Sequence, residues 1–184
     1  MSKLSDYLAS YIIPIRVGPF QLKKIASLKI ASHKMHKKLI ITKEPVDAAL
    51  RKELVEYVFP IVGCMHFVHE NLGPGLPEYC YQEALFKKLK KEGFVAYKEY
   101  QHHPVFEGVA LECFIKMDLM VKMPRGNVII ECKSIKEISD REQFQTFGYL
   151  RGTEFPIALL VNFGTWPKAQ IERYYYKDGN IRAF

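Results

Sequence analysis

The 184-residue chain carries 27 Lys or Arg against 20 Asp or Glu, which gives a formal net charge of +7. This length predicts one domain with an appendage or at most two small domains, and no apolar run reaches the roughly 18 residues that would span a membrane. Scattered cysteines without a CxxC pair argue against a zinc site and predict buried, reduced thiols in a cytoplasmic protein: Cys64, Cys80, Cys113 and Cys132.

The positive charge is concentrated near the N-terminus. Residues 1–45 hold nine Lys or Arg and two acidic residues, whereas residues 46–184 hold eighteen of each sign. We therefore expect a basic extension over 1–45 and a main domain over 46–184. The extension is a nucleic-acid-binding arm, an amphipathic surface segment, an organelle transit peptide, or sequence upstream of a true start at Met35. Because the main domain has no net charge, the high pI does not indicate that this domain binds nucleic acid.

The main domain begins with two predicted helices. Apolar residues recur at helical spacing over 46–71, and Pro60 either kinks or divides that helix. A Gly-rich break over 72–76 precedes Pro77, which suits the first position of a second helix that ends at Gly93. The apolar face of this helix carries Cys80, Tyr81, Ala84, Leu85 and Leu89.

The second half alternates predicted strands with one helix. Strand-like segments lie near 94–101, 103–107, 109–122 and 127–134. Ser139 and Glu142 have capping-box spacing and open a helix over about 140–151. The apolar run 157–163 is typical of a central buried strand, and a hairpin joins 170–176 to 181–184. The predicted order is helix, helix, three or four strands, helix, strand and hairpin.

Three charged residues lie in two of the apolar strands. Glu131 and Lys133 are two apart, so they project from the same face of a strand. If the hairpin pivots between Pro124 and Arg125, Asp118 lies opposite Glu131. Two carboxylates and an ammonium then meet in a sheet built for burial, where a divalent metal ion would offset their cost. A solvated cross-strand ion pair is the structural alternative for these three residues.

Two further motifs surround this group. Gly75-x-x-Glu78-x-x-Tyr81 opens the second helix, and Gln145-x-x-x-Tyr149 places two polar side chains on one face of the third. With the Asp and Glu-x-Lys strands between them and LLVNFG after them, the motifs resemble the PD-(D/E)xK nuclease superfamily. The chain is most similar to a small bacterial family of that superfamily named for GxxExxY, over about residues 50–176.

The resemblance implies an α/β fold with a restriction-endonuclease-like core, in which helices flank a central mixed sheet. It also implies hydrolysis of phosphodiester bonds in DNA with Mg²⁺ or Mn²⁺. Carried over by position, Asp118 and Glu131 match the metal-binding carboxylates, Glu78 an additional ligand, and Lys133 the lysine that assists the attacking water. The main-chain carbonyl of Cys132 is a further candidate ligand.

Gln145 and Tyr149 match helix residues that orient the site or the nucleic-acid backbone. Two departures from the family pattern are Met117 in place of Pro and Phe114-Ile115 in place of Gly-Tyr. The resemblance also leaves a homodimer open.

A nuclease-like fold without turnover, serving as a nucleic-acid- or protein-binding module, is the alternative function. The zero net charge of the main domain favours it. His66 and His69, and His102 and His103, lack a third zinc ligand, so we expect helix-surface and strand-end histidines. We expect a solvated helix face from Lys87, Lys88, Lys90 and Lys91. We expect core packing and strand propensity, and not base stacking, to account for Trp166 and Tyr174–Tyr176.

Overall fold

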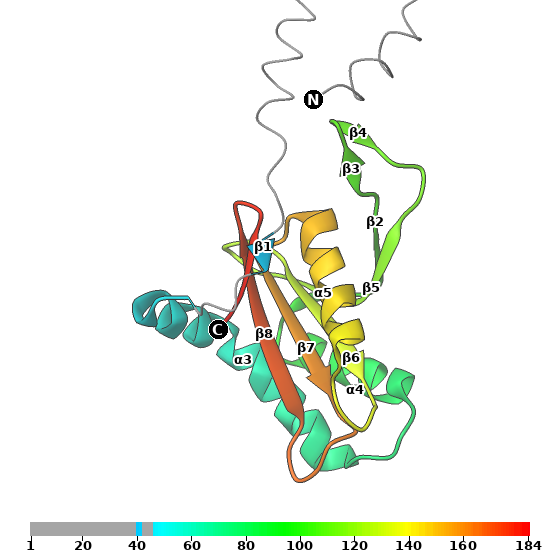
Figure 1. Ribbon diagram of the computed structural model, residues 1–184. Coiled ribbons are helices and arrows are strands. Elements are labelled where there is room, and N and C mark those ends of the chain that lie inside the picture. The colour runs from blue at the N-terminus through cyan, green and yellow to red at the C-terminus, as the bar shows by residue number, and fades with distance from the viewer. Residues whose placement is uncertain (1–39, 42–45) are drawn as a thin grey trace, which may run out of the picture. The chain divides into compact units, whose positions relative to one another are not determined.

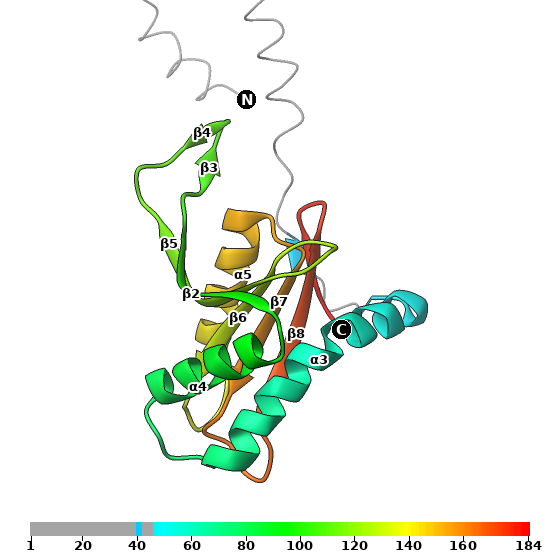
Figure 2. The ribbon, with the colours of Figure 1, turned by 180° about the vertical axis from the view of Figure 1, so that it is seen from behind.

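The computed structural model describes Ile40–Ile41 and residues 46–184; what the sequence predicts for the remainder of the extension lies outside the described residues. Within this described part, seven strands form one mixed sheet in the order β1-β9-β8-β7-β6-β5-β2, and β3 and β4 form a separate hairpin. Helices α3 and α4 lie on one side of the sheet and α5 on the other (Figures 1 and 2). The predicted α/β fold with a helix-flanked mixed sheet is confirmed.

The helices and strands have the following bounds. The helices are α3 (Ala48–Leu72), α4 (Glu78–Lys91) and α5 (Asp140–Thr153). The strands are β1 (Ile40–Ile41), β2 (Val95–His102), β3 (Val105–Phe106), β4 (Val109–Ala110), β5 (Ile115–Lys122), β6 (Val128–Lys133), β7 (Ile157–Asn162), β8 (Gln170–Lys177) and β9 (Asn180–Ala183). No helix among the described residues is long and apolar enough to cross a membrane.

The helix ends follow the local chemistry of the sequence. Asp47 caps α3 by accepting a hydrogen bond from the Leu50 amide, and Pro60 lies inside this helix without dividing it. Pro77 is the N-cap of α4 and not its first helical residue. The capping box that opens α5 is present, because Ser139 accepts from the first turn while the Glu142 side chain accepts from the Ser139 amide.

The strand predictions are confirmed with one change. The segment expected as a single strand over 109–122 divides into β4 and β5, separated by four residues outside any strand. Strand β7 is buried along its whole length at the centre of the sheet, as its apolar run predicts. Strands β8 and β9 form the predicted hairpin.

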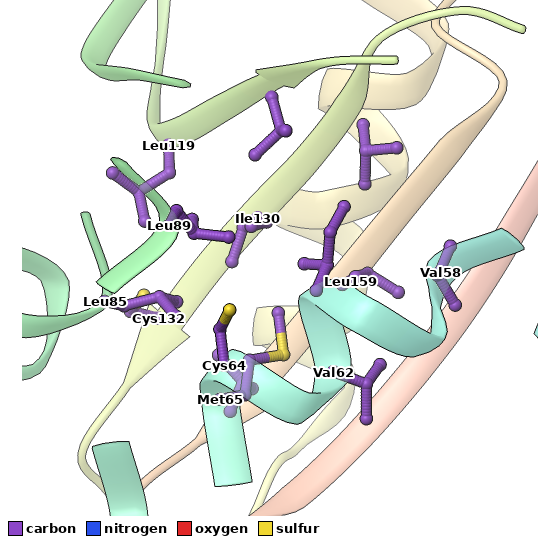
Figure 3. Close-up of a cluster of buried hydrophobic side chains, with 14 of the residues drawn as sticks. Val58, Val62, Cys64, Met65, Leu85, Leu89, Leu119, Ile130, Cys132 and Leu159 are labelled. Carbon is purple, nitrogen blue, oxygen red and sulfur yellow. The ribbon is translucent and has the colours of Figure 1, made fainter. Parts of the chain in front are cut away.

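Two apolar clusters hold the layers together, one on each face of the sheet. The larger cluster joins α3 and α4 to the sheet and includes Met65, Leu85 and Ile130 (Figure 3). The smaller cluster packs Phe147 and Leu150 of α5 against the opposite face. Burial of side chains on both faces explains why β7 reads as a continuous apolar run. The core therefore fixes the strand ends from which the polar site projects.

Several side-chain predictions are wrong. His69 is buried and its Nε2 lies 2.8 Å from the carbonyl oxygen of Thr165, although a surface histidine was expected. Trp166 is 75% exposed and not in the core, because the loop after β7 carries it outward. Cys113 is exposed and Cys80 half-buried, so only Cys64 and Cys132 are the buried thiols that composition predicts.

Other predictions about side chains hold. Tyr174 is buried and Tyr175 and Tyr176 are half-buried. Three of the four α4 lysines are exposed, while Lys88 packs over the Phe67 ring at 4.0 Å. His102 ends β2, as expected for a strand-end histidine.

Candidate active site

The candidate site lies where β5 and β6 separate. These antiparallel strands pair from Val121↔Val128 to Leu119↔Ile130, which is the register predicted from a pivot between Pro124 and Arg125. Asp118 and Glu131 are the next residues along this register, just past the last pair. Beyond this point β5 continues alongside β2, while β6 continues alongside β7. The fork places polar side chains at the border of the buried sheet.

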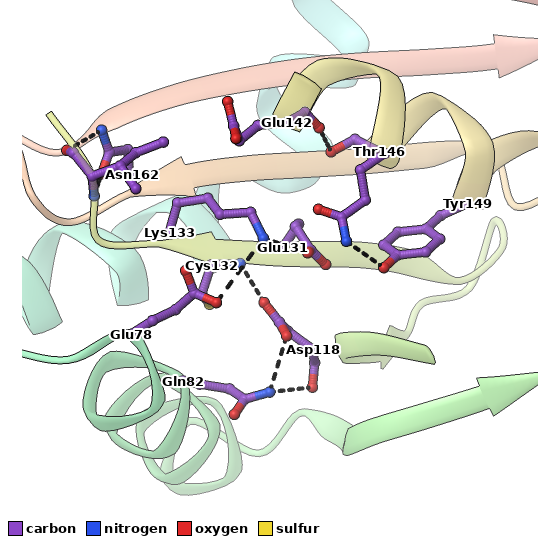
Figure 4. A network of polar contacts seen from close by, with 12 residues as sticks. Glu78, Gln82, Asp118, Glu131, Cys132, Lys133, Glu142, Thr146, Tyr149 and Asn162 are labelled. Atoms are coloured by element: carbon purple, nitrogen blue, oxygen red, sulfur yellow. Dashed lines mark hydrogen bonds and ion pairs between the residues drawn. The ribbon is translucent and has the colours of Figure 1, made fainter. Parts of the chain in front are cut away.

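The Asp118 carboxylate is fixed by neighbours on two elements. Its Oδ2 accepts a hydrogen bond from the main-chain amide of Cys132 at 2.8 Å, and its Oδ1 lies 3.3 Å from Nε2 of Gln82 on α4. The side chain therefore bridges the fork where main-chain pairing has stopped (Figure 4). The Cys132 thiol is fully buried in the cluster beneath α3 and α4, so this residue offers the site only its main chain.

Glu131 and Lys133 form a buried ion pair on the face of β6. The Lys133 Nζ donates to Glu131 Oε1 at 2.7 Å and lies 4.0 Å from Oε1 of Glu78 at the start of α4. The other oxygen of Glu131, Oε2, is buried and has no hydrogen-bond partner. Such an orphaned carboxylate oxygen is costly, because burial removes its water and nothing replaces it.

The electrostatics of the site reflect this crowding. Burial raises the pKa of Asp118 to about 6, against the opposing effects of the Cys132 amide and Lys133. Burial and the nearby Asp118 charge raise the pKa of Glu131 to about 7. Although burial acts to lower the pKa of Lys133, the carboxylates of Glu131, Glu78 and Asp118 raise it above its ordinary value. The site thus favours a cation and resists two uncompensated carboxylates.

Helix α5 brings Gln145 and Tyr149 close to Glu131 on β6 (Figure 4). Nε2 of Gln145 donates to the Tyr149 hydroxyl at 2.9 Å, as expected for residues four apart on one helical face. Burial, together with the negative charge of Glu131, raises the pKa of Tyr149 to about 12. The phenol therefore stays protonated at neutral pH and keeps its own proton for donation.

Tyr81 supports the position of Glu78 through the Gly-rich turn. The Tyr81 hydroxyl donates to the Gly73 carbonyl at 2.7 Å and accepts from the Leu76 amide at 3.0 Å. Its ring is fully buried and stacks on Phe163 with ring centres 4.8 Å apart. Tyr81 thereby ties the turn before α4 to the core, which fixes the helix start that carries Glu78. Tyr81 therefore both packs in the core and supports the position of Glu78.

Sequence reasoning missed a group of hydrogen bonds that clamps the chain at the C-terminal end of β6. Asn162 Oδ1 accepts from the amides of Ile135 and Gly164, and its Nδ2 donates to the Ile135 carbonyl at 2.9 Å. A Cβ at Gly164 would meet the Ile135 carbonyl oxygen at 2.5 Å, so the two chain segments touch through main-chain atoms. The clamp holds the segment directly after Lys133. The sequence signal that could have indicated this clamp was Asn162, a polar residue at the end of the apolar β7 run.

Gln82 and Glu99 are the other missed residues. Gln82 follows Glu78 by four positions, so the shared helical face could have indicated it. Glu99 carried no local signal, because its role depends on strands and a helix distant in sequence. Its Oε1 accepts from Gln82 Nε2 at 2.7 Å.

The donor set suits a hard divalent cation. Carboxylate oxygens are the ligands preferred by Mg²⁺ and Mn²⁺, and Asp118 and Glu131 supply them, including the orphaned Oε2. Among the described residues, however, no three His, Cys, Asp or Glu side chains are grouped closely enough to enclose an ion. Water or nucleic-acid oxygens would have to complete the coordination, which is usual for Mg²⁺.

The family that the chain matches agrees with the chemistry of the site. A family model described as the PD-(D/E)XK nuclease superfamily matches residues 55–174, well over half of the chain. The matched region includes α4, both strands of the fork, and α5. No curated protein and no solved structure matches the chain.

Proposed function

We propose that this chain, which belongs to the PD-(D/E)XK nuclease superfamily, is a metal-dependent nuclease that hydrolyses phosphodiester bonds in DNA. Members of such a superfamily are typically nucleases that act on nucleic acid with divalent metal ions. One observation carries the proposal for this chain. Asp118 and Glu131 lie together at the fork with raised pKa values and an orphaned oxygen, beside a Lys133 held in its charged form.

Asp118 and Glu131 would hold the metal ion, with Glu78 and the carbonyl of Cys132 as further ligands. A bound Mg²⁺ or Mn²⁺ would supply positive charge for the phosphate and make water more acidic. Lys133 keeps its proton, so its ammonium stabilises phosphate oxygens and orients the attacking water, and does not act as a base. Tyr149, held by Gln145, has a proton to donate to a phosphate oxygen.

We assign the chain to the bacterial GxxExxY family, because its motif has a physical role here through Tyr81 and the Gly73 turn. We propose that residues 46–184 form the main domain, with Ile40–Ile41 of the basic extension over 1–45 adding strand β1 to its sheet, and that the protein works in the cytoplasm and can assemble as a homodimer.

The test is cleavage of linear, single-stranded, nicked and branched DNA with Mg²⁺, Mn²⁺ or EDTA. Wild-type protein is compared with Asp118→Asn and Lys133→Met, and with Lys122→Met, which removes an exposed lysine from the far end of β5. We expect metal-dependent cutting that both site variants lose and Lys122→Met keeps. Cutting in EDTA, or in Asp118→Asn, would contradict the proposal.

A catalytically inactive module that binds nucleic acid or protein is the second candidate. The balanced charge of residues 46–184 favours it, because nucleic-acid affinity normally rests on basic surface. The absence of a closely grouped ligand triad among the described residues also favours it. Wild-type protein that is folded, binds no Mn²⁺ by calorimetry and cuts none of the DNAs would select this second function.

A further inference from the structure

Gln82 connects the Asp118 carboxylate to a second acidic residue. Its side-chain nitrogen lies 2.7 Å from Glu99 Oε1, 3.2 Å from the Asp118 carbonyl oxygen and 3.3 Å from Asp118 Oδ1. Gln82 is buried, and it points from α4 toward Asp118 (Figure 4). Since Cys132 holds the opposite oxygen of the same carboxylate, both Asp118 oxygens have a donor. Their orientation is therefore set before any ion binds.

Glu99, which accepts from Gln82, lies where the backbone of β2 is distorted. Lys98 pairs with Leu119 and Tyr100 with Met117, but Glu99 is skipped in this ladder. Its φ is 53°, in the left-handed region that a glutamate rarely adopts. Strained backbone of this kind persists where surrounding contacts hold it, and it is concentrated at functional sites. The contacts here are the hydrogen bond to Gln82 and an ion pair with Lys116.

We propose that Gln82, held by Glu99, is a positioning residue that orients the Asp118 carboxylate for metal binding. This inference rests on the proposed function and deepens it. Groups that hydrogen-bond to a ligating carboxylate fix its direction, and their loss typically weakens metal affinity or activity by roughly 10- to 100-fold. Glu99 does not touch the ion or the substrate in this account, and acts through the amide of Gln82.

The experiment compares two substitutions of Glu99 that both remove its charge. Glu99→Gln keeps an oxygen that can accept from Gln82, whereas Glu99→Gly removes it and relieves the backbone strain, since glycine adopts positive φ readily. Gln82→Met removes the donor at similar size. Glu83→Gln is the matched control, because it breaks the neighbouring α4–β2 ion pair with Lys98 without facing Asp118. Mn²⁺ affinity by calorimetry, DNA cleavage and melting temperature are measured for each.

We expect Gln82→Met and Glu99→Gly to bind Mn²⁺ roughly 10- to 100-fold more weakly and to lose kcat, with KM for DNA little changed. Glu99→Gln and Glu83→Gln should resemble wild type, and Glu99→Gly should melt no lower than Glu99→Gln. The Gln82→Met/Glu99→Gly double variant should bind Mn²⁺ and cut DNA no less well than either single variant, because both substitutions break the same chain of hydrogen bonds.

Three results would overturn the inference. Gln82→Met that binds Mn²⁺ and cuts like wild type removes the positioning role. Equal losses in Glu83→Gln assign the effect to general packing of α4. Equal losses in Glu99→Gln and Glu99→Gly assign it to charge and not to the hydrogen bond. Wild-type protein that neither binds Mn²⁺ nor cuts DNA would overturn the proposed function, and with it the positioning role of Gln82 and Glu99.

Discussion

The amide of Cys132 donates to Oδ2 of Asp118 at 2.8 Å, just past the last main-chain pair between β5 and β6, which joins Leu119 to Ile130. A side-chain carboxylate thus occupies the place of a main-chain acceptor at the fork. The hydrogen bond satisfies an amide that the separating strands would otherwise leave buried and unpaired. It also fixes a negative charge beside Glu131, and this proximity is the physical origin of the site's electrostatics.

Stability of the metal-free protein should fall as pH rises through this site. The folded pKa values of Asp118 and Glu131, about 6 and about 7, lie above the ordinary values of 3.8 and 4.5. The folded state therefore binds protons more tightly, so the stabilisation is complete below pH ~4 and is lost as pH rises to ~7. Asp118→Asn removes one titrating group and should be more stable than wild type at pH 8, by on the order of 2 kcal/mol.

Urea denaturation in EDTA between pH 4 and pH 8 measures this effect. The difference between Asp118→Asn and wild type should vanish near pH 4, where both side chains are uncharged. Adding Mg²⁺ at pH 8 should stabilise wild type but not Asp118→Asn. The difference between their free energies of unfolding should then become smaller. A difference independent of pH would mean that the carboxylate is not destabilised by burial.

Removing the Lys133 ammonium should destabilise the protein as well as abolish cleavage. At pH 8, above its pKa of about 7, the almost fully buried Glu131 is charged, so Lys133→Met leaves this charge without a partner, which typically costs about 3 kcal/mol. The loss should shrink at pH 5, where Glu131 takes up a proton. Adding Glu131→Gln to Lys133→Met should restore most of the stability but none of the activity, as measured by denaturation and cleavage. No recovery in the double variant would contradict a buried ion pair.

The sequence predicted those parts of the fold that depend on local chemistry. The capping box at Ser139 and the register around the Pro124 turn follow from residues a few positions apart. His69 was missed because its partner, the Thr165 carbonyl, lies 96 positions away. Helical periodicity places His69 on the same side as buried residues but cannot supply the loop that covers it.

The candidate site divides in the same way. Residues that touch each other across one hairpin, Asp118 and Glu131, could be paired from strand alternation alone. Glu99 could not, because its side chain enters the site through a backbone conformation that breaks strand alternation. Trp166 was assigned to the core by residue type, and only the loop after β7 decides its exposure. Departures from regular geometry therefore set the limit of prediction.

The Tyr81 hydroxyl should contribute stability separately from its ring. Tyr81→Phe keeps the stacking on Phe163 but removes the bonds to Gly73 and Leu76, and leaves these main-chain groups without that partner. We expect a loss of about 1–2 kcal/mol in the free energy of unfolding and weaker Mn²⁺ binding through Glu78. Tyr79→Phe on the exposed face of α4 is the control and should change neither quantity. Equal behaviour of the two variants would contradict a role in holding the turn.

Gly164 should be intolerant of any side chain, because it lies against the segment after Lys133. A Cβ there would be 2.5 Å from the Ile135 carbonyl oxygen and 2.7 Å from its amide nitrogen, and main-chain atoms cannot turn aside as a side chain can. Gly164→Ala should cost about 2 kcal/mol and shift Lys133, which lowers cleavage more than DNA binding. The control is Gly63→Ala within α3, where a Cβ meets nothing within 4 Å. That substitution should stabilise by about 1 kcal/mol, since alanine favours helix over glycine. Thermal denaturation of both variants and of wild type measures these changes in stability. A Gly164→Ala variant as stable as wild type would show that the two chain segments can move apart to admit the Cβ.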